Sequence, residues 1–153
     1  MPTMPIPRVK NMIGRALRGV VDPEPTGKQI SRLWEYFSST CAYCGRAVQK
    51  KNKSAHIDHL IPTSKKGTNH ISNRVLSCAS CNEQEKKEMD WEPFLHQKNP
   101  SDIDFHARKQ RILDWQKHQG GPVTLFEDAA RALEKATRTV HNSLDEQVKE
   151  LRK

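Results

Sequence analysis

The sequence predicts an α+β fold, in which helices flank a small core of two short strands and one helix. Four cysteines in two Cys-x-x-Cys pairs, which begin at Cys41 and Cys78, would staple this core. Between the pairs, short β-branched runs alternate with polar turns, whereas both ends of the chain show the apolar spacing of helices. The chain has 153 residues and is 35% hydrophobic, so we expect a modest core that needs this staple.

Two helices are expected before the first cysteine pair. Residues 9–20 carry apolar side chains at helical spacing with basic side chains between them, and the segment 22–27, with two prolines and a glycine, ends this helix. A second helix is predicted over residues 28–38. It would bury its aromatic side chains and lead the chain to Cys41.

The segment between the cysteine pairs predicts the two strands. Residues 55–61 have the apolar and β-branched content of a short strand, and residues 63–69 form a polar loop with a glycine turn. Residues 71–77 form either a second strand or an irregular return. Adjacent residues of a strand point to opposite faces, so for Asp58 and His59 to line one cleft we expect a strand end or a bulge there.

A helix is expected to leave the second cysteine pair. Residues 82–89 are strong helix formers without a breaker. On such a helix, Lys86 and Lys87 would pair with the neighbouring acidic side chains at helical spacing. The core therefore has the order strand, loop, strand-like return, helix.

The C-terminal third predicts two more helices, over residues 105–118 and 125–151. At 1.5 Å per residue the second would reach roughly 40 Å, longer than a small domain requires. We therefore expect either a homodimer through this helix or packing on its own chain. The expected organisation is an N-terminal helical segment (1–40), a core domain (41–95) and a C-terminal helical extension (96–153).

The four cysteines match the ligand set of a closed structural zinc site, in which each Cys-x-x-Cys turn donates two sulfurs. Two disulfides are the alternative, but they need an oxidising compartment, and the N-terminus lacks a charged region followed by an apolar one. A redox-active cysteine pair is a further alternative, but it would need only one Cys-x-x-Cys motif, and this chain has two. The zinc ligands are expected to be Cys41, Cys44, Cys78 and Cys81, in a reducing cytoplasm.

Charge and hydropathy limit the classes of molecule that the protein is expected to bind. The net charge is +8, and seven of the eight excess positive charges lie in residues 1–90. Such a basic region favours a polyphosphate partner. No segment approaches the roughly 18 consecutive apolar residues of a membrane span, so no membrane is expected.

With these features together, the chain resembles the HNH endonucleases of the ββα-metal group. The resemblance covers roughly residues 41–95. It rests on five motifs: Cys41-x-x-Cys44-Gly45, Asp58-His59-x-Ile61-Pro62, Gly67-Thr68-Asn69, Asn73, and Cys78-x-x-Cys81-Asn82. The third position of the name-giving His-Asn-His pattern is Asn82 here, a variant familiar in the family.

The resemblance implies roles for the residues between and beside the cysteines. His59 would be the general base, and Asn73 would fix the loop and orient His59. Asp58 and Asn82 would hold one divalent cation. Because an amide oxygen is a harder ligand than imidazole, the ion is expected to be Mg²⁺ or Mn²⁺. His56 lies two residues before Asp58, on the same strand face, and is a candidate further ligand.

The leading hypothesis is a metal-dependent endonuclease that hydrolyses phosphodiester bonds of double-stranded DNA and leaves 5′-phosphate and 3′-hydroxyl ends. Basic side chains on the polar loops beside the strand would contact phosphates. They are Lys50, Lys51, Lys53, Lys65, Lys66 and His70. The alternatives are a non-catalytic zinc-knuckle module that binds nucleic acid, and a protein adaptor that works through its long C-terminal helix.

Overall fold

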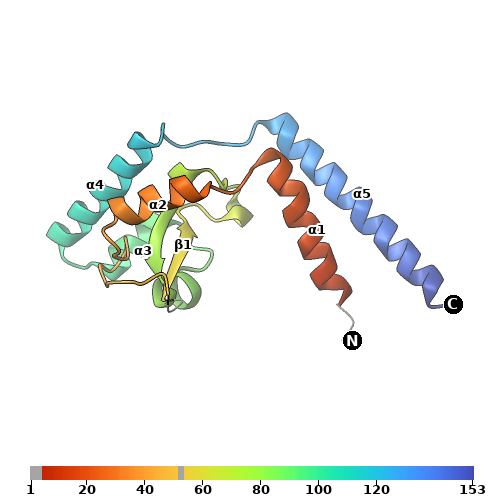
Figure 1. Ribbon diagram of the computed structural model, residues 1–153, viewed down its shortest axis with the longest axis horizontal. Coiled ribbons are helices and arrows are strands. Elements are labelled where there is room, and N and C mark those ends of the chain that lie inside the picture. Colours follow the sequence, from red (N-terminus) through yellow and green to blue (C-terminus); the bar gives the residue numbers. More distant parts are fainter. Residues whose placement is uncertain (1–4, 52–53) are drawn as a thin grey trace. The chain divides into compact units, whose positions relative to one another are not determined.

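The structure, a computed structural model, describes residues 5–51 and 54–153. These residues separate into two compact units. One unit contains residues 24–124, with the strands and the cysteines, and the other combines the helices at the two ends of the chain (Figure 1). A small antiparallel sheet among helices confirms the predicted α+β class.

The sheet of residues 24–124 pairs β1 (Ala55–His59) with β2 (Arg74–Cys78). The register is continuous, with Asp58 opposite Val75 and His59 opposite Arg74. The strand end that we expected near residues 58–59 is therefore confirmed, and the pairing contains no bulge. All five residues of β2 are buried, so this strand runs through the centre of the unit.

Helix α2 (Gly27–Tyr36) agrees with the prediction of a helix over residues 28–38. It begins with a capping box, because the Thr26 hydroxyl accepts a hydrogen bond from the Gln29 backbone and the Gln29 side chain accepts one from the Thr26 backbone. Leu33 is fully buried on its inner face. The helix delivers the chain to the first cysteine turn, as expected.

Two further helices follow the sheet in this unit, and the second of them contacts the end of α2 through Tyr36 and Trp115. Helix α4 (Asp102–His118) was predicted over residues 105–118, whereas α3 (Trp91–Lys98) was not predicted. The buried Trp115 of α4 donates its indole N–H to the carbonyl oxygens of Arg74 at 2.9 Å and Ile71 at 3.3 Å. Helix α4 is thereby tied to the start of β2.

The connections contain short helical turns. A 3-10 turn, η1 (Thr63–Lys65), lies in the predicted polar loop, and a second, η2 (Ile71–Asn73), precedes β2. The predicted helix after Cys81 is a seven-residue π-helix, η3 (Ser80–Lys86). Its last bond joins the Lys87 N–H to the Asn82 carbonyl five residues back, and Lys87 has φ 46°.

This π-helix overturns the expected ion pairs of the segment. Lys86 does not point to the surface with its acidic neighbours but pairs with Asp58 of β1. Glu85 pairs instead with Lys98 of α3 at 2.8 Å. A hydrogen bond to the fifth residue adds one residue to the turn, so helical spacing assigned the wrong partners.

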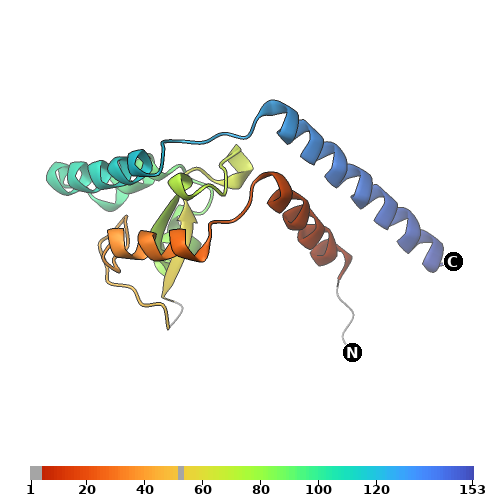
Figure 2. The ribbon, with the colours of Figure 1, turned by 45° about the horizontal axis from the view of Figure 1, so that its top comes forward.

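The second unit pairs α1 (Ile6–Val21) with α5 (Glu127–Leu151), which lie side by side in both views (Figures 1 and 2). Lys10 forms an ion pair with Asp145 at 2.5 Å, and its carbonyl oxygen contacts Nε2 of His141 at 3.0 Å. The two long predicted helices are thus present and pack on each other. Among the described residues, we find no helix that is both long and apolar enough to cross a membrane.

Candidate active site

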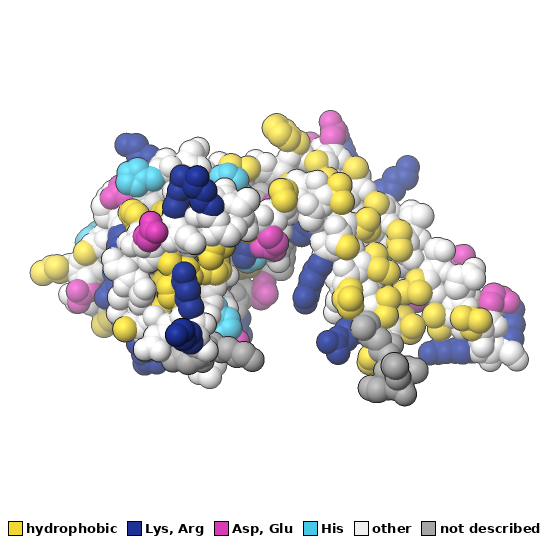
Figure 3. Space-filling view, in the orientation of Figure 1, with side chains coloured by type: hydrophobic (Ala, Val, Ile, Leu, Met, Phe, Trp, Pro, Cys, Tyr) yellow, Lys and Arg dark blue, Asp and Glu magenta, His cyan; other side chains and the backbone are white. Residues whose placement is uncertain are grey.

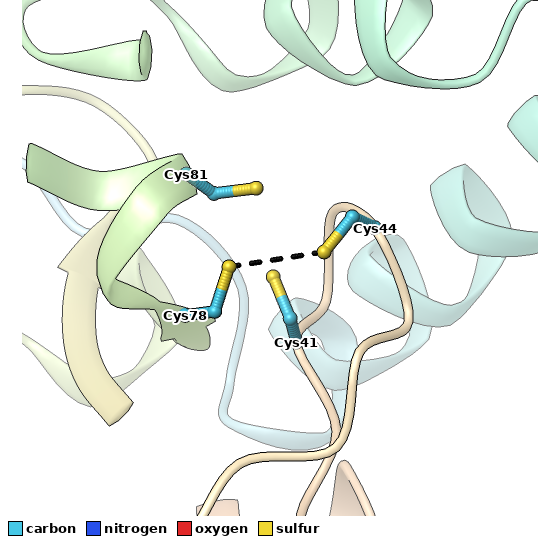
Figure 4. A group of neighbouring side chains, drawn as sticks. All are labelled: Cys41, Cys44, Cys78 and Cys81. Carbon is cyan, nitrogen blue, oxygen red and sulfur yellow. Dashed lines mark hydrogen bonds between the residues drawn. The ribbon is translucent and has the colours of Figure 1, made fainter. Parts of the chain in front are cut away.

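The four cysteines converge on one point (Figure 4). Their sulfurs lie within 4.8 Å of one another. The distance between the Cys44 and Cys78 sulfurs is 3.8 Å. A tetrahedron with the usual Zn–S bond length has an S···S edge of about 3.8 Å, so the spacing fits one zinc ion. The zinc-ligand prediction and the geometry therefore agree.

The protonation of these thiols also favours a cation. Hydrogen bonds from Cys41 and Cys81 lower the pKa of Cys44 to about 3. Hydrogen bonds with Cys41 and Cys44, together with burial, raise the pKa of Cys81. Four such close sulfurs cannot all ionise without a positive charge among them, and Zn²⁺ supplies that charge when thiolates bind it.

Next to the cysteines, a cavity of about 360 Å³ is lined by three of the four predicted catalytic residues, all except Asn73. Asp58 and His59 reach it from the end of β1, and Asn82 reaches it from the first turn of η3. Its other lining residues are Pro62, Thr63, Glu83, Lys86, Lys87 and Glu88. Asp58 and His59 are the last two residues of β1, and both line this cavity.

Asp58 is held by two buried donors. The Tyr43 hydroxyl donates to its Oδ2 at 2.7 Å, and Nζ of Lys86 lies 3.2 Å from the same oxygen. Burial raises the pKa of Asp58, while Lys86 and Tyr43 act in the opposite direction. Burial and the nearby Asp58 charge raise the pKa of Tyr43 well above its usual value, so its hydroxyl keeps the proton that it donates.

His59 is engaged through both ring nitrogens. Its Nε2 lies 3.0 Å from Oδ1 of Asn69, and its Nδ1 lies 3.2 Å from a guanidinium nitrogen of Arg74. Arg74 also donates to Asn69 Oδ1 at 2.8 Å and pairs with Glu24 at 2.6 Å. Asn69 and Arg74 were not assigned this role from the sequence, although Asn69 lies in one of the motifs that carried the resemblance.

Asn73 fixes the loop that carries these groups. Its Oδ1 accepts a hydrogen bond from the Ile61 N–H at 2.9 Å, and its Nδ2 donates to the carbonyl oxygens of Ile61 at 3.0 Å and Thr68 at 2.8 Å. Its backbone carbonyl accepts the N–H of Leu60 at 2.9 Å. Asn73 thus joins both ends of the segment between β1 and Asn69, and its influence on His59 runs through that segment.

The remaining predicted site residues that the structure describes do not line the cavity. His56 pairs through Nε2 with Glu83 at 3.3 Å. Lys50 lies 5.1 Å from the centre of the Trp34 ring, and Lys65 pairs with Asp90 at 3.4 Å. Lys51 and Lys66 are exposed. Nδ1 of His70 accepts a hydrogen bond from the Ser72 N–H at 3.3 Å and so caps the turn that follows it. Lys53 lies outside the described residues.

The donors at this cavity suit a hard divalent ion. A carboxylate from Asp58 and an amide from Asn82 line the same space, and oxygen ligands of this kind are those that Mg²⁺ and Mn²⁺ prefer. The four sulfurs, by contrast, suit a soft or borderline ion such as zinc. The cysteine cluster and this cavity therefore differ in the kind of ion that their donor atoms suit.

The core of two strands and a helix contains four cysteines that could hold a metal ion, and an Asp–His pair at the end of β1 lines a polar cavity beside them. These features define a metal-stabilised domain with a candidate reaction cavity. Residues 41–88 match the family model of HNH endonuclease. The match covers about a third of the chain and points to a nuclease domain in this segment, with nucleic acid as its partner. No curated protein matches the chain.

Proposed function

We propose that the protein is a metal-dependent DNA endonuclease that hydrolyses phosphodiester bonds in the cavity beside the four cysteines. The observation that carries the proposal is that Asp58, His59 and Asn82 line one cavity inside the segment that matches the HNH family. Residues 41–95 form the nuclease domain in this proposal, with 1–40 and 96–153 as its helical flanks. Zinc thiolates need a reducing environment, so we place the protein in the cytoplasm.

His59 is the general base that takes a proton from the attacking water. An imidazole has an ordinary pKa near 6.5 and suits proton transfer at neutral pH. Arginine has only donors, so Nδ1 must accept the hydrogen bond from Arg74 and Nε2 must carry the proton that it shares with Asn69. Nδ1 is therefore the basic nitrogen, and Arg74 has to shift for it to receive a proton.

Asp58 and Asn82 would hold the divalent ion, Mg²⁺ or Mn²⁺. When bound, such an ion neutralises the charge that develops on the departing 3′ oxygen, which leaves a 3′-hydroxyl and a 5′-phosphate. Tyr43 and Lys86 keep the Asp58 carboxylate fixed for this task. His56, which pairs with Glu83 of the cavity lining, is a candidate further ligand.

Basic side chains bring the duplex to the cavity through phosphate contacts. Lys51, Lys65 and Lys66 are exposed on the loops that flank the sheet, and Lys50 extends beside Trp34. Lys53 and His70 complete the proposed set. Contacts of this kind position a duplex without reading its sequence, so binding should weaken as salt rises.

The test is nicking of supercoiled plasmid by the zinc-loaded protein with Mg²⁺, with Mn²⁺ or with EDTA. The wild type should produce open-circular or linear DNA only with a divalent ion, and His59→Ala should lower the rate about 10²- to 10⁴-fold. His106→Ala is the matched control, because His106 is exposed on α4. Salt-sensitive binding with no cleavage under any metal would instead favour a zinc-knuckle binding module, and no binding at all would favour an adaptor.

The proposal includes a homodimer formed by the helices at the chain ends. Figure 3 shows a band of hydrophobic side chains along α1 and α5, neither of which has a fully buried residue. Met12 is 51% exposed and Val20 81%. Helix α1 carries four basic residues and no acidic one, whereas α5 carries six acidic and four basic residues. Because α1 and α5 already pair within one chain, a second copy that packs against this band would cover the apolar side chains that this pairing leaves exposed.

Sedimentation of the full chain tests this dimer. The wild type should be dimeric, and Met12→Glu should give a monomer because it places a charge in the apolar face. Asn11→Glu adds the same charge about 100° away around the helix and should leave the dimer intact. A wild-type monomer at every concentration would remove the dimer, and a monomeric enzyme should nick a duplex rather than cut both strands.

A further inference from the structure

Lys86 is a buried lysine at the end of the π-helix. Its side chain is 1% exposed, its Nζ donates to the His59 carbonyl oxygen at 2.7 Å, and it lies 3.2 Å from Oδ2 of Asp58. Lysine is rarely buried unless it is paired, and this one is paired with a carboxylate that lines the reaction cavity. The π-turn that ends at Lys87 directs it there.

Tyr43, in the first cysteine turn, donates to the same oxygen. It is fully buried between the first two cysteines, and its hydroxyl lies 2.7 Å from Oδ2 of Asp58. Both donors therefore occupy one oxygen of the carboxylate. A cation that binds Asp58 therefore binds a carboxylate whose orientation is fixed by Tyr43 and Lys86 and whose charge is already paired with the Lys86 ammonium.

The charges nearest to Asp58 make the cavity a weak site for a divalent ion. The Lys86 ammonium compensates the Asp58 charge, and Asn82, the other proposed ligand, is neutral. The two other acidic residues of the lining are engaged elsewhere, Glu83 with His56 and Glu88 with the Ser64 hydroxyl. The lining as a whole has three carboxylates and two ammonium groups, so an ion that enters this cavity meets a formal net charge of only −1.

A nucleic-acid phosphate supplies the missing charge. We infer that Lys86 is a built-in counter-cation that keeps the divalent-ion site weak in the free protein, so that the ion and a DNA phosphate bind together. The inference rests on the proposed function, because it takes Asp58 as a metal ligand. Lys86 is a positioning residue here: it acts through Asp58 and does not touch the substrate.

Manganese binding measures this effect without any catalysis. The zinc-loaded full chain carrying His59→Ala, which prevents turnover, is titrated with Mn²⁺ while free Mn²⁺ is followed by electron paramagnetic resonance. A short DNA duplex should tighten Mn²⁺ binding at least about tenfold, since one unit charge this close shifts the binding of a proton by that much or more. This comparison needs no substitution of Lys86.

Lys86→Gln tests the lysine itself, because glutamine keeps a donor for the His59 carbonyl and removes the charge. It should tighten Mn²⁺ binding in the DNA-free protein about tenfold and reduce the effect of DNA. Lys87→Gln is the control, since Lys87 lines the same cavity but is exposed, and it should change the affinity much less. Zinc content and the thermal melt verify that each variant folds.

The outcomes separate this inference from the proposed function. Mn²⁺ binding that Asp58→Asn abolishes, but that neither DNA nor Lys86→Gln alters by more than twofold, overturns the role of Lys86 and leaves the nuclease proposal standing. Failure of Lys86→Gln to fold leaves the DNA comparison decisive. If no Mn²⁺ binding that depends on Asp58 is found even with DNA, both the metal site and the proposed function are wrong.

Discussion

Arg74 donates a hydrogen bond to Nδ1 of His59 across 3.2 Å, from the residue directly opposite in the sheet register. The same guanidinium binds Asn69, which accepts the hydrogen bond from Nε2 of His59. The imidazole is therefore fixed at both nitrogens, and its tautomer is set by a partner that can only donate. In the free protein the His59 ring is therefore held in one orientation, and its proposed basic nitrogen, Nδ1, already accepts a hydrogen bond from Arg74.

Replacement of Arg74 should therefore impair cleavage more than DNA binding. Arg74→Lys keeps a charge but cannot contact His59 and Asn69 together, because lysine lacks the planar fork of arginine. We expect the single-turnover nicking rate to fall about 10²-fold, the lower end of what a general base contributes. Arg131→Lys is the control, since Arg131 is exposed on α5.

A second readout distinguishes positioning from a general structural defect. Nitrogen NMR of the His59 ring in the folded wild type should show the proton on Nε2, and Arg74→Lys should shift the balance toward the other tautomer. An unchanged nicking rate together with an unchanged ring spectrum would exclude this role for Arg74.

Removal of the structural metal should unfold the sheet. The four sulfurs come from two turns that are otherwise joined only by noncovalent contacts, such as the hydrogen bond from the Ala42 N–H to the Leu76 carbonyl oxygen, among the residues that the structure describes. Structural zinc sites contribute on the order of 10 kcal/mol. Cys78→Ser, or a strong zinc chelator, should abolish the cooperative thermal transition of residues 24–124. Circular dichroism with zinc analysis measures it, and a folded metal-free protein would contradict the zinc assignment.

The cysteine cluster and the Asp58–His59–Asn82 cavity were predictable because residue type and short spacing carry that information. Two thiols three residues apart fit one ion, and an acid next to a histidine at a strand end can share one cavity. Helices with strong amphipathic patterns, such as α1 and α5, were predictable for the same reason: the pattern is local.

The partners of the site residues were not predictable, because they depend on which side chains meet across the fold. Asn69 and Arg74 reach His59 only once the loop closes, and Lys86 turns inward only because η3 is a π-helix. A sequence pattern with a period of 3.6 residues places Lys86 on the surface. Helix α3 was missed because its eight residues include a proline and show little amphipathic spacing.

Gly67 should tolerate no side chain. A Cβ at this position would lie 2.6 Å from the carbonyl carbon of Ile61 and 2.9 Å from the carbonyl oxygen of Pro62, which are backbone atoms that cannot turn away. Gly67→Ala should therefore cost about 1–3 kcal/mol of unfolding free energy and displace the loop that carries Asn69. Denaturant unfolding and the nicking rate measure the two effects.

Gly14→Ala is the matched control for Gly67→Ala. Nothing lies within 4 Å of a Cβ at Gly14, which is inside α1. Alanine is the better helix former there by about 1 kcal/mol, so this variant should be as stable as the wild type or more so. Equal effects of the two substitutions would show that the loop adapts to a side chain at Gly67.

Helix α4 should be needed for activity although it lies outside the HNH match. Trp115 donates its indole N–H to the backbone of Arg74, and Arg74 in turn fixes His59. Trp115→Phe keeps most of the buried ring but removes the indole N–H. The carbonyl oxygens of Ile71 and Arg74 then lose this hydrogen-bond donor. We expect a loss of about 1–3 kcal/mol in unfolding free energy.

The nicking rate of folded Trp115→Phe should also fall, because β2 then holds Arg74 less rigidly. Trp34→Phe is the control: Trp34 is only partly buried and its ring contacts Lys50. The rates are compared at a temperature where all three proteins are fully folded. A normal rate for Trp115→Phe, despite its lower stability, would mean that the link from α4 through Arg74 to His59 stabilises the domain without positioning the base.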